Sequence, residues 1–237
     1  MLSSSDHFLV EEKNVVRVKI CGIRDWEEAR AVLDAGVDTL GFVFARSPRA
    51  IKPEAAREII TKLPPFTTTV GVFVNEPRYS LMEIASFCRL DVLQLHGDEP
   101  PEYCHGLSQR LIKAIRVRDA ASLAGLEAYR EVQGFLLDAW VPGKAGGTGT
   151  TFNWELVRGA ATGGKPVILA GGLTPENVGA AIQLVHPYAV DVSSGVEVDG
   201  RKNPARIAAF LEAVRKAEEH HVRPTASSCC KGLKGDF

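Results

Sequence analysis

The sequence has no excess of charge of either sign and no long apolar run. Its 28 Lys and Arg stand against 29 Asp and Glu, for a formal net charge of -1, and the basic residues are dispersed. Without a basic patch the chain does not attract a phosphate backbone, so we expect no nucleic-acid partner. No segment approaches the roughly 18 apolar residues of a membrane span, and the first residues lack the pattern of a signal peptide. We therefore expect a cytoplasmic protein with no membrane partner.

The sequence is also poor in cysteine, and its thiols follow no metal-binding or disulfide pattern. The five cysteines contain no CxxC pair and no even framework, so we expect neither a zinc site nor a disulfide scaffold. This usage is typical of a reducing cytoplasm. Two of the thiols fall within helical patterns and are expected to be core or surface residues. The cysteines are Cys21, Cys88, Cys104, Cys229 and Cys230.

Short runs rich in β-branched residues recur along the chain and alternate with helical patterns. Strands separated by helices favour right-handed βαβ units, and about eight such units close a (β/α)8 barrel. A doubly wound open sheet is the alternative, but it usually carries GxGxxG after its first strand, where this chain has Cys-Gly-Ile-Arg. We predict a barrel with strands at 16–20, 39–44, 69–74, 91–95, 111–117, 134–137, 166–169 and 188–192.

Several helix starts are visible in the sequence, and we expect a helix after each strand. Asp25 is a candidate N-cap for a helix over 26–35, with Glu28 three residues on and Gly36 at the stop. Proline at the first helical position marks further starts. These are Pro53, Thr174 with Pro175, and Asn203 with Pro204.

The length suits one large domain with short extensions at both ends. We predict an N-terminal extension over 1–14, a barrel over 15–218 and a C-terminal tail over 219–237. Both ends lack apolar periodicity, so we expect them to be disordered.

Two predicted strands end in reactive side chains. Cys21 follows Val-Lys-Ile, and Asp138 follows Phe-Leu-Leu. In α/β barrels the carboxyl ends of the strands carry the catalytic groups. The two-residue period places Lys19 on the same face as Cys21, so we expect its ammonium to lower the thiol pKa towards that of a general base. A buried structural cysteine is the alternative.

Glycine-bearing loops follow the seventh and eighth predicted strands, at 170–173 and 191–195. In barrels these two loops form a phosphate cradle from backbone N–H groups, although each glycine alone could simply make a tight turn. Because both loops occur after the appropriate strands, we predict phosphate binding. The predicted residues are Gly171, Gly172, Ser193, Ser194 and Gly195.

Further polar residues are expected at the same rim. Gln94 and His96 close the fourth strand on one face, and a positioning role for His96 is favoured over that of a second base. Arg46 and Arg49 follow the second strand, where either could bind a carboxylate or remain on the surface. The glycine-rich segment 142–150, beside the candidate acid, is a mobile lid or a plain linker, and its position favours the lid.

These segments together resemble the phosphoribosylanthranilate isomerase family, whose members are (β/α)8 enzymes of tryptophan biosynthesis. The resemblance runs from about Val16 to Val214. The resembling segments are VKICGI at 18–23, GFVF at 41–44, VGVFVN at 70–75, DVLQLHG at 91–97, LLDA at 136–139, GGTGTTFNW at 146–154, AGGLTPENV at 170–178 and VDVSSGVE at 190–197.

The resemblance implies an Amadori rearrangement of N-(5-phosphoribosyl)anthranilate to 1-(2-carboxyphenylamino)-1-deoxyribulose 5-phosphate. It implies that Cys21 is the general base, that Asp138 is the general acid and that Arg49, with Arg46 as the alternative, meets the anthranilate carboxylate. It implies no cofactor and no metal, a small phosphosugar substrate, and a monomer or homodimer. The family's phosphate site carries over to Gly172, Ser194 and Gly195, and the other expected pocket residues are Lys19, Gln94, His96 and Asp191.

Three other functions are less consistent with these residues. A non-catalytic phosphosugar-binding barrel would not need Cys21 or Asp138. A related isomerase of histidine biosynthesis uses two aspartates, which the cysteine disfavours. A barrel synthase acting on indole precursors would need a lysine acid at the rim and a longer N-terminal helical extension.

Overall fold

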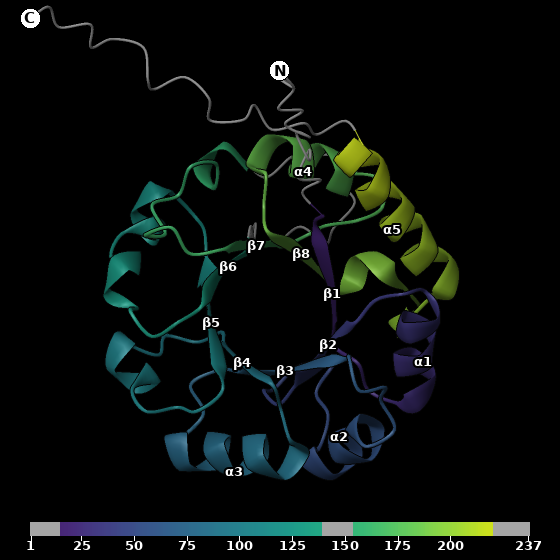
Figure 1. Cartoon of the computed structure of the whole chain (residues 1–237), viewed down its shortest axis with the longest axis horizontal. Helices are drawn as coiled ribbons and strands as arrows, with labels where there is room; N and C mark the ends of the chain where they lie inside the picture. The colour runs from purple at the N-terminus through teal and green to yellow at the C-terminus, as the bar shows by residue number, and fades with distance from the viewer. Residues whose placement is uncertain (1–14, 139–153, 220–237) are drawn as a thin grey trace, which may run out of the picture.

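The computed structural model describes residues 15–138 and 154–219, which form a closed barrel of eight parallel strands inside a ring of helices (Figure 1). The strands follow one another in chain order, and β1 pairs with β8 to close the sheet. The predicted barrel is confirmed and the open sheet is excluded. The strands are β1 (Arg17–Cys21), β2 (Thr39–Val43), β3 (Thr68–Phe73), β4 (Val92–Leu95), β5 (Arg110–Arg116), β6 (Gly134–Asp138), β7 (Val167–Ala170) and β8 (Ala189–Val192).

Residues 1–14, 139–153 and 220–237 lie outside the described part of the chain. The predicted disordered extensions, the predicted lid over 142–150 and two of the cysteines, Cys229 and Cys230, fall there. The domain boundaries therefore stay predictions.

Local sequence explains where most of the longer helices begin. The Asp25 side chain accepts a hydrogen bond from the backbone N–H of Glu28 at 3.0 Å, as predicted for an N-cap. Asn203 caps α5 in the same way, through the N–H of Arg206 at 3.1 Å. Pro53 is the first residue of its helix. The helices are α1 (Trp26–Asp34), α2 (Pro53–Ile60), α3 (Arg78–Cys88), α4 (Val178–Val185) and α5 (Pro204–Glu219).

The expectation of a helix after each strand is wrong for the middle of the barrel. Short 3-10 helices stand where longer helices were expected after β4 and β5. After β6 the described chain resumes at Trp154, with a further 3-10 helix. Gly125 has a left-handed backbone, which interrupts the segment after β5 between two 3-10 helices. The 3-10 helices are η1 (Pro101–Cys104), η2 (Ala120–Leu123), η3 (Leu126–Ala128) and η4 (Trp154–Leu156).

The start predicted for α4 at Thr174 and Pro175 is also wrong, because that helix begins at Val178. The Asn177 side chain accepts from the N–H of Thr174 at 2.8 Å and donates to the carbonyl of Gly172 at 2.9 Å. These two bonds stabilise a turn in place of the first helical turn.

After β8 the chain adds a short helix and a small hairpin that the sequence patterns did not predict. The helix is η5 (Ser194–Val196), and the hairpin consists of β9 (Glu197–Val198) paired antiparallel with β10 (Arg201–Lys202). Strands of two residues are too short to show a recognisable alternation of apolar and polar residues in the sequence.

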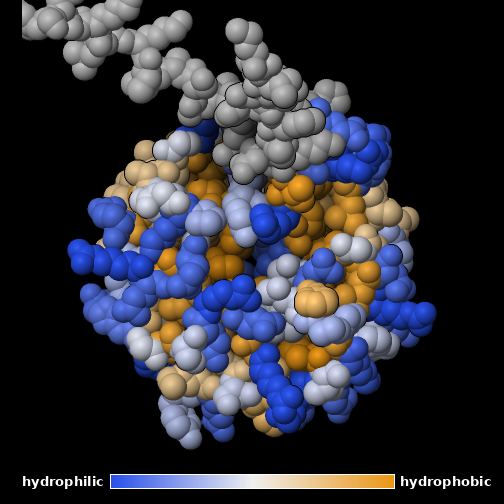
Figure 2. Space-filling model, in the orientation of Figure 1, coloured by the Kyte–Doolittle hydropathy of each residue, from blue (hydrophilic) through white to orange (hydrophobic). Residues whose placement is uncertain are grey.

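The alternation of residues along the strands creates two separate cores. The larger core lies between the barrel and the helices and contains residues such as Leu137 and Leu169. Figure 2 shows polar residues over the outer surface and apolar residues deeper between them. Residues one position along the same strands point inward and form a smaller cluster inside the barrel. This cluster consists of Ala114, Leu136, Ile168, Ala170 and Ala189.

Within residues 15–138 and 154–219, no helix is long and apolar enough to cross a membrane. In the same part of the chain, no group of three or more His, Cys, Asp or Glu residues is arranged to hold a metal ion.

Candidate active site

The two predicted reactive side chains lie at the same mouth of the barrel. Cys21 is the last residue of β1, and Asp138 is the last residue of β6. Because all eight strands are parallel, their carboxyl ends share one rim. Cys21 is buried, whereas the Asp138 side chain is 20% exposed. The arrangement gives one sheltered thiol and one partly solvated carboxyl group at a common opening.

Gly41 provides the space for the thiol. It lies opposite Cys21 in the register between β1 and β2. A Cβ atom at Gly41 would be 2.9 Å from Cys21 Sγ and 3.0 Å from Lys19 Nζ, so a larger residue could not fit without displacing them. Gly41 was not among the predicted site residues, although a glycine inside a strand often marks such a close approach.

Lys19 and Asp191 form a buried ion pair inside the barrel. Their residues are register partners on β1 and β8, and Lys19 Nζ lies 2.9 Å from Asp191 Oδ1. The two side chains are only 5% and 9% exposed. Burial lowers the pKa of Lys19, but the charges of Asp191 and Cys21 outweigh it and leave that pKa raised. Lys19 therefore stays an ammonium.

Lys19 lowers the pKa of Cys21, as predicted, but the prediction that the pKa ends below its ordinary value is wrong. Burial raises the pKa of the thiol, Lys19 opposes that change, and the carboxylate of Asp191 adds to it. The ammonium is shared with Asp191, so it only partly offsets the loss of hydration. The net result is a Cys21 pKa above the ordinary thiol value.

On the other side of the mouth, Asp138 is hydrogen-bonded to the predicted rim histidine. His96 Nε2 lies 3.3 Å from Asp138 Oδ2, and His96 Nδ1 lies 3.0 Å from Gln94 Nε2. The sequence analysis placed Gln94 and His96 on one face but did not connect them to Asp138. Gln94 Oε1 is buried and has no hydrogen-bond partner among the described residues. The three side chains form a polar row from β4 to β6.

A second buried ion pair supports the loop that carries His96. Lys113 Nζ lies 2.7 Å from Glu99 Oε2 and donates to the carbonyl of Gly97 at 2.7 Å. Glu99 in turn accepts from the backbone N–H groups of Asn75 and Gly97. These contacts fix the backbone that follows β4. The sequence analysis did not identify this pair, because its partners come from a strand and a separate loop.

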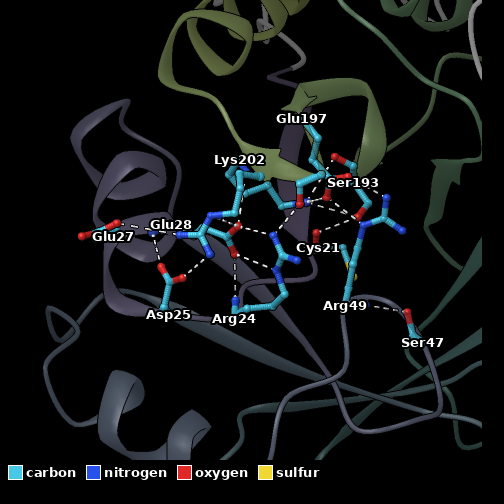
Figure 3. A network of polar contacts seen from close by, with 12 residues as sticks. Cys21, Arg24, Asp25, Glu27, Glu28, Ser47, Arg49, Ser193, Glu197 and Lys202 are labelled. Atoms are coloured by element: carbon cyan, nitrogen blue, oxygen red, sulfur yellow. Dashed lines mark hydrogen bonds and ion pairs between the residues drawn. The ribbon is translucent and has the colours of Figure 1, made fainter.

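Arg49 is held by an acidic residue from the β9–β10 hairpin (Figure 3). Its Nε and Nη2 atoms donate to Glu197 Oε1 and Oε2, both at 2.7 Å. Burial raises the pKa of Glu197, but Arg49 and Lys202 outweigh it and hold that pKa at about 2. Arg46, the other candidate in this loop, is exposed. Of the two arginines, only Arg49 has this fixed bidentate position.

Gly22 brings Arg49 and Ser193 close to the end of β1. It has φ of +84°, and a Cβ atom there would lie 2.6 Å from Arg49 Cδ and 3.2 Å from Ser193 Oγ. Ser193 Oγ donates to the carbonyl of Cys21 at 2.9 Å. Figure 3 shows Cys21, Arg49 and Ser193 together. The glycine after the thiol is therefore needed both for its backbone angle and for its lack of a side chain.

The two predicted phosphate loops contact each other. A Cβ atom at Gly195 would lie 1.8 Å from the carbonyl oxygen of Leu173, so only glycine fits there. Arg206 of α5 donates to the carbonyl of Gly195 at 3.0 Å and pairs with Glu176, which ties both loops to one helix. Arg206 was not among the predicted site residues.

The loops also present free backbone donors. Among the described residues, none accepts a hydrogen bond from the backbone N–H of Gly172, Ser194 or Gly195. Such N–H groups are the donors that a phosphate cradle requires.

The fold and the site define a class of protein: a (β/α)8-barrel enzyme with a thiol and a carboxyl group at its catalytic mouth. The family described as N-(5'-phosphoribosyl)anthranilate (PRA) isomerase matches residues 18–213. The chain belongs to this family.

Individual relatives agree with the family match. A PRA isomerase from Moorella thermoacetica is 98% identical over 223 residues, which are 94% of this chain and 100% of the relative. The crystal structure of the Thermotoga maritima isomerase has a TM-score of 0.78 at 43% identity and covers 85% of this chain and 99% of that one. A PRA isomerase in complex with reduced 1-(o-carboxyphenylamino)-1-deoxyribulose 5-phosphate has a TM-score of 0.75 at 41% identity, with the same coverage.

The chain is thus an isomerase of tryptophan biosynthesis that converts N-(5-phosphoribosyl)anthranilate into 1-(2-carboxyphenylamino)-1-deoxyribulose 5-phosphate. The resemblance inferred from the sequence is confirmed. The non-catalytic barrel, the histidine-pathway isomerase and the indole synthase are excluded by the family match.

Proposed function

We propose that Cys21 is the general base and Asp138 the general acid of this isomerisation. The Asp138 proton passes to the furanose ring oxygen, the ring C–O bond breaks, and a Schiff base forms at C1. Cys21 thiolate then takes the proton from C2 to give an enolamine. Protonation at C1 and loss of the proton from the C2 hydroxyl give the ketone product. The observation that carries this assignment is the placement of both side chains at carboxyl ends of strands at one mouth.

The assignment is tested with Cys21→Ala and Asp138→Asn. Each variant should lose about 10²- to 10⁴-fold in turnover, because a positioned acid or base contributes that much. Both should still bind the reduced product that a relative binds, measured by calorimetry. Cys88→Ala, which removes a buried thiol in α3, is the control and should keep full turnover. Unaltered turnover in either active-site variant contradicts the role of that residue.

His96 and Gln94 position the acid in this proposal. Gln94 Nε2 can only donate, so His96 Nδ1 accepts from it and the neutral imidazole carries its proton on Nε2. His96 Nε2 then donates to Asp138 Oδ2, which orients the carboxyl group and leaves its other oxygen to carry the acid proton. Gln94 then fixes the orientation of the imidazole through Nδ1. Lys19 and Asp191 act beneath the thiol, where the ammonium stabilises the thiolate when it forms.

The two ends of the substrate are held by separate groups. Arg49 binds the anthranilate carboxylate, because its guanidinium is fixed beside the end of β1 and Arg46 is not. The phosphate binds the loops after β7 and β8, where backbone N–H groups without described partners are grouped. The phosphate-binding residues are Gly171, Gly172, Ser193, Ser194 and Gly195.

The remaining assignments concern the whole chain. The enzyme acts in the cytoplasm, is a monomer or a homodimer, and needs no metal or cofactor, since the rearrangement opens the sugar ring and moves protons with no net oxidation or reduction of the substrate. Light scattering of the purified chain distinguishes monomer from dimer. Dialysis against a chelator should leave turnover unchanged, and a loss restored by metal contradicts the cofactor-free route.

A further inference from the structure

The β9–β10 hairpin places two buried charges beside Arg49. Lys202 and Glu197 are register partners in the hairpin, and Lys202 Nζ lies 2.7 Å from Glu197 Oε1. The Lys202 side chain is 0% exposed and that of Glu197 7% exposed. Buried charges of this kind need a partner to be stable, and each has one here. The Glu197 carboxylate is consequently locked in one orientation.

The way in which Glu197 contacts Arg49 leaves one edge of the guanidinium available. A guanidinium has five N–H donors in a planar fork, and it can grip a carboxylate along either of two edges. Glu197 occupies the edge formed by Nε and Nη2. No described residue accepts a hydrogen bond from Arg49 Nη1, and Figure 3 shows this end of the side chain turned away from Glu197.

Lys202 also contacts the strand end next to the thiol. Its Nζ donates to the carbonyl and to the hydroxyl oxygen of Ser193, both at 3.2 Å. Ser193 in turn donates to the carbonyl of Cys21. One lysine therefore connects the hairpin that holds Arg49 with the backbone that carries the base (Figure 3).

We propose that Glu197, held by Lys202, is a positioning residue that orients Arg49 so that its remaining edge receives the carboxylate of the substrate. The proposal rests on the proposed role of Arg49. A long arginine side chain loses rotamer freedom when it binds a ligand, and a guanidinium already fixed by a buried carboxylate has lost that freedom beforehand. Because the two carboxylates use different edges, Glu197 does not have to leave when substrate binds.

The opposite effect is also physically possible and would overturn the proposal. Glu197 brings a negative charge close to the incoming carboxylate, and like charges repel. If repulsion exceeded the gain from orientation, removal of the Glu197 charge would tighten the binding of carboxylated ligands.

The test compares two ligands by calorimetry: the reduced product, and the same compound with phenyl in place of carboxyphenyl. Both carry the phosphate, so the ratio of their affinities reports on the carboxylate alone. In Glu197→Gln we expect binding of the carboxylated ligand to weaken about tenfold, the effect of losing one charge-assisted contact. The ligand without the carboxyl group should bind within about twofold of its normal affinity. In steady-state kinetics KM should rise with kcat little changed.

Three further variants keep the test decisive. Glu197→Gln leaves Lys202 buried without its counter-ion, so Glu197→Gln combined with Lys202→Met removes both charges and should keep the selective loss. Arg201→Met is the matched control, because Arg201 is in the same hairpin but pairs with Asp25 and should leave both affinities unchanged. Arg49→Met should weaken the binding of the carboxylated ligand about tenfold and leave the binding of the other ligand unchanged.

The outcomes separate the two proposals. Equal weakening of both ligands in Glu197→Gln, tighter binding of the carboxylated ligand, or recovery in the double variant overturns the positioning role. If Arg49→Met does not distinguish the two ligands, the proposed role of Arg49 fails and the role of Glu197 fails with it. If Arg49→Met distinguishes them and Glu197→Gln does not, only the role of Glu197 fails.

Discussion

At the scale of single residues, the groups around Cys21 determine the protonation of its thiol. The thiol is buried beside an ammonium that is already paired with Asp191, so its pKa is raised in the absence of substrate. A thiol in this state is mostly protonated near neutral pH and resists oxidation, because only the thiolate is strongly nucleophilic. The same ammonium lies ready to stabilise the thiolate during proton abstraction.

The raised pKa of Cys21 predicts how the rate depends on pH. A general base must lose its proton before it acts, so kcat/KM, which reports on the free enzyme, should rise with pH. We expect the midpoint of that rise to lie above 9.0, the ordinary value for this thiol. Steady-state measurements from neutral to alkaline pH check it. A midpoint below the ordinary value would contradict the dominance of burial.

At the scale of elements, a glycine allows the loops after two neighbouring strands to contact each other closely. The loop after β8 approaches the loop after β7 so closely at Gly195 that the Leu173 carbonyl occupies the position of a side chain. Arg206 on α5 donates a hydrogen bond to the carbonyl of Gly195. The shape of the predicted phosphate cradle therefore depends on the packing of two loops and one helix.

Gly195→Ala should separate the two loops. The added Cβ would have to move a backbone carbonyl, so we expect KM to rise about tenfold and stability to fall by about 1–3 kcal/mol. Kinetics and urea unfolding measure the two effects. Gly179→Ala in α4 is the control, because its nearest contacts would be ordinary at 3.8 and 4.0 Å. An unchanged KM in Gly195→Ala would mean that the phosphate binds elsewhere.

At the scale of the whole molecule, ion pairs link different elements of the barrel, two of them across more than half of the chain. Glu197 joins the hairpin to the loop after β2, Asp191 joins β8 to β1, and Glu99 joins the loop after β4 to β5. All three carboxylates are buried, and so are the lysine partners of Asp191 and Glu99, whereas Arg49 is partly exposed. The pKa of Glu197 is lowered, so its contribution to stability should fall when it is protonated in acid.

Glu197 gives this acid sensitivity a defined range. Its pKa is lowered from 4.5 to about 2 in the folded protein, so its contribution to stability is full above 4.5 and is lost as the pH falls towards 2. Urea unfolding at a series of acidic pH values should show a smaller loss over this range in Glu197→Gln than in the parent. Parallel curves for the two proteins would exclude Glu197 as a source of the effect.

Much of the architecture could be predicted because local patterns carry it. Strand runs, N-caps such as Asp25 and prolines such as Pro53 act through neighbouring residues, and the predicted strand ends agree with the structure to within one residue. The predictions of helices failed where hydrogen bonds outside the helix pattern determine the backbone. Asn177 bonds to the turn before it and delays α4, and the 3-10 helices after β4 and β5 replace expected helices.

The sequence by itself determined the barrel, the strand ends that carry Cys21 and Asp138, and the glycine loops, because each depends on a periodic or local signal. Tertiary structure alone decided which charges meet. Arg49 lies 148 residues from Glu197, and Lys19 lies 172 residues from Asp191. Only closure of the barrel brings such residues within hydrogen-bond distance, and burial then sets whether the thiol pKa rises or falls.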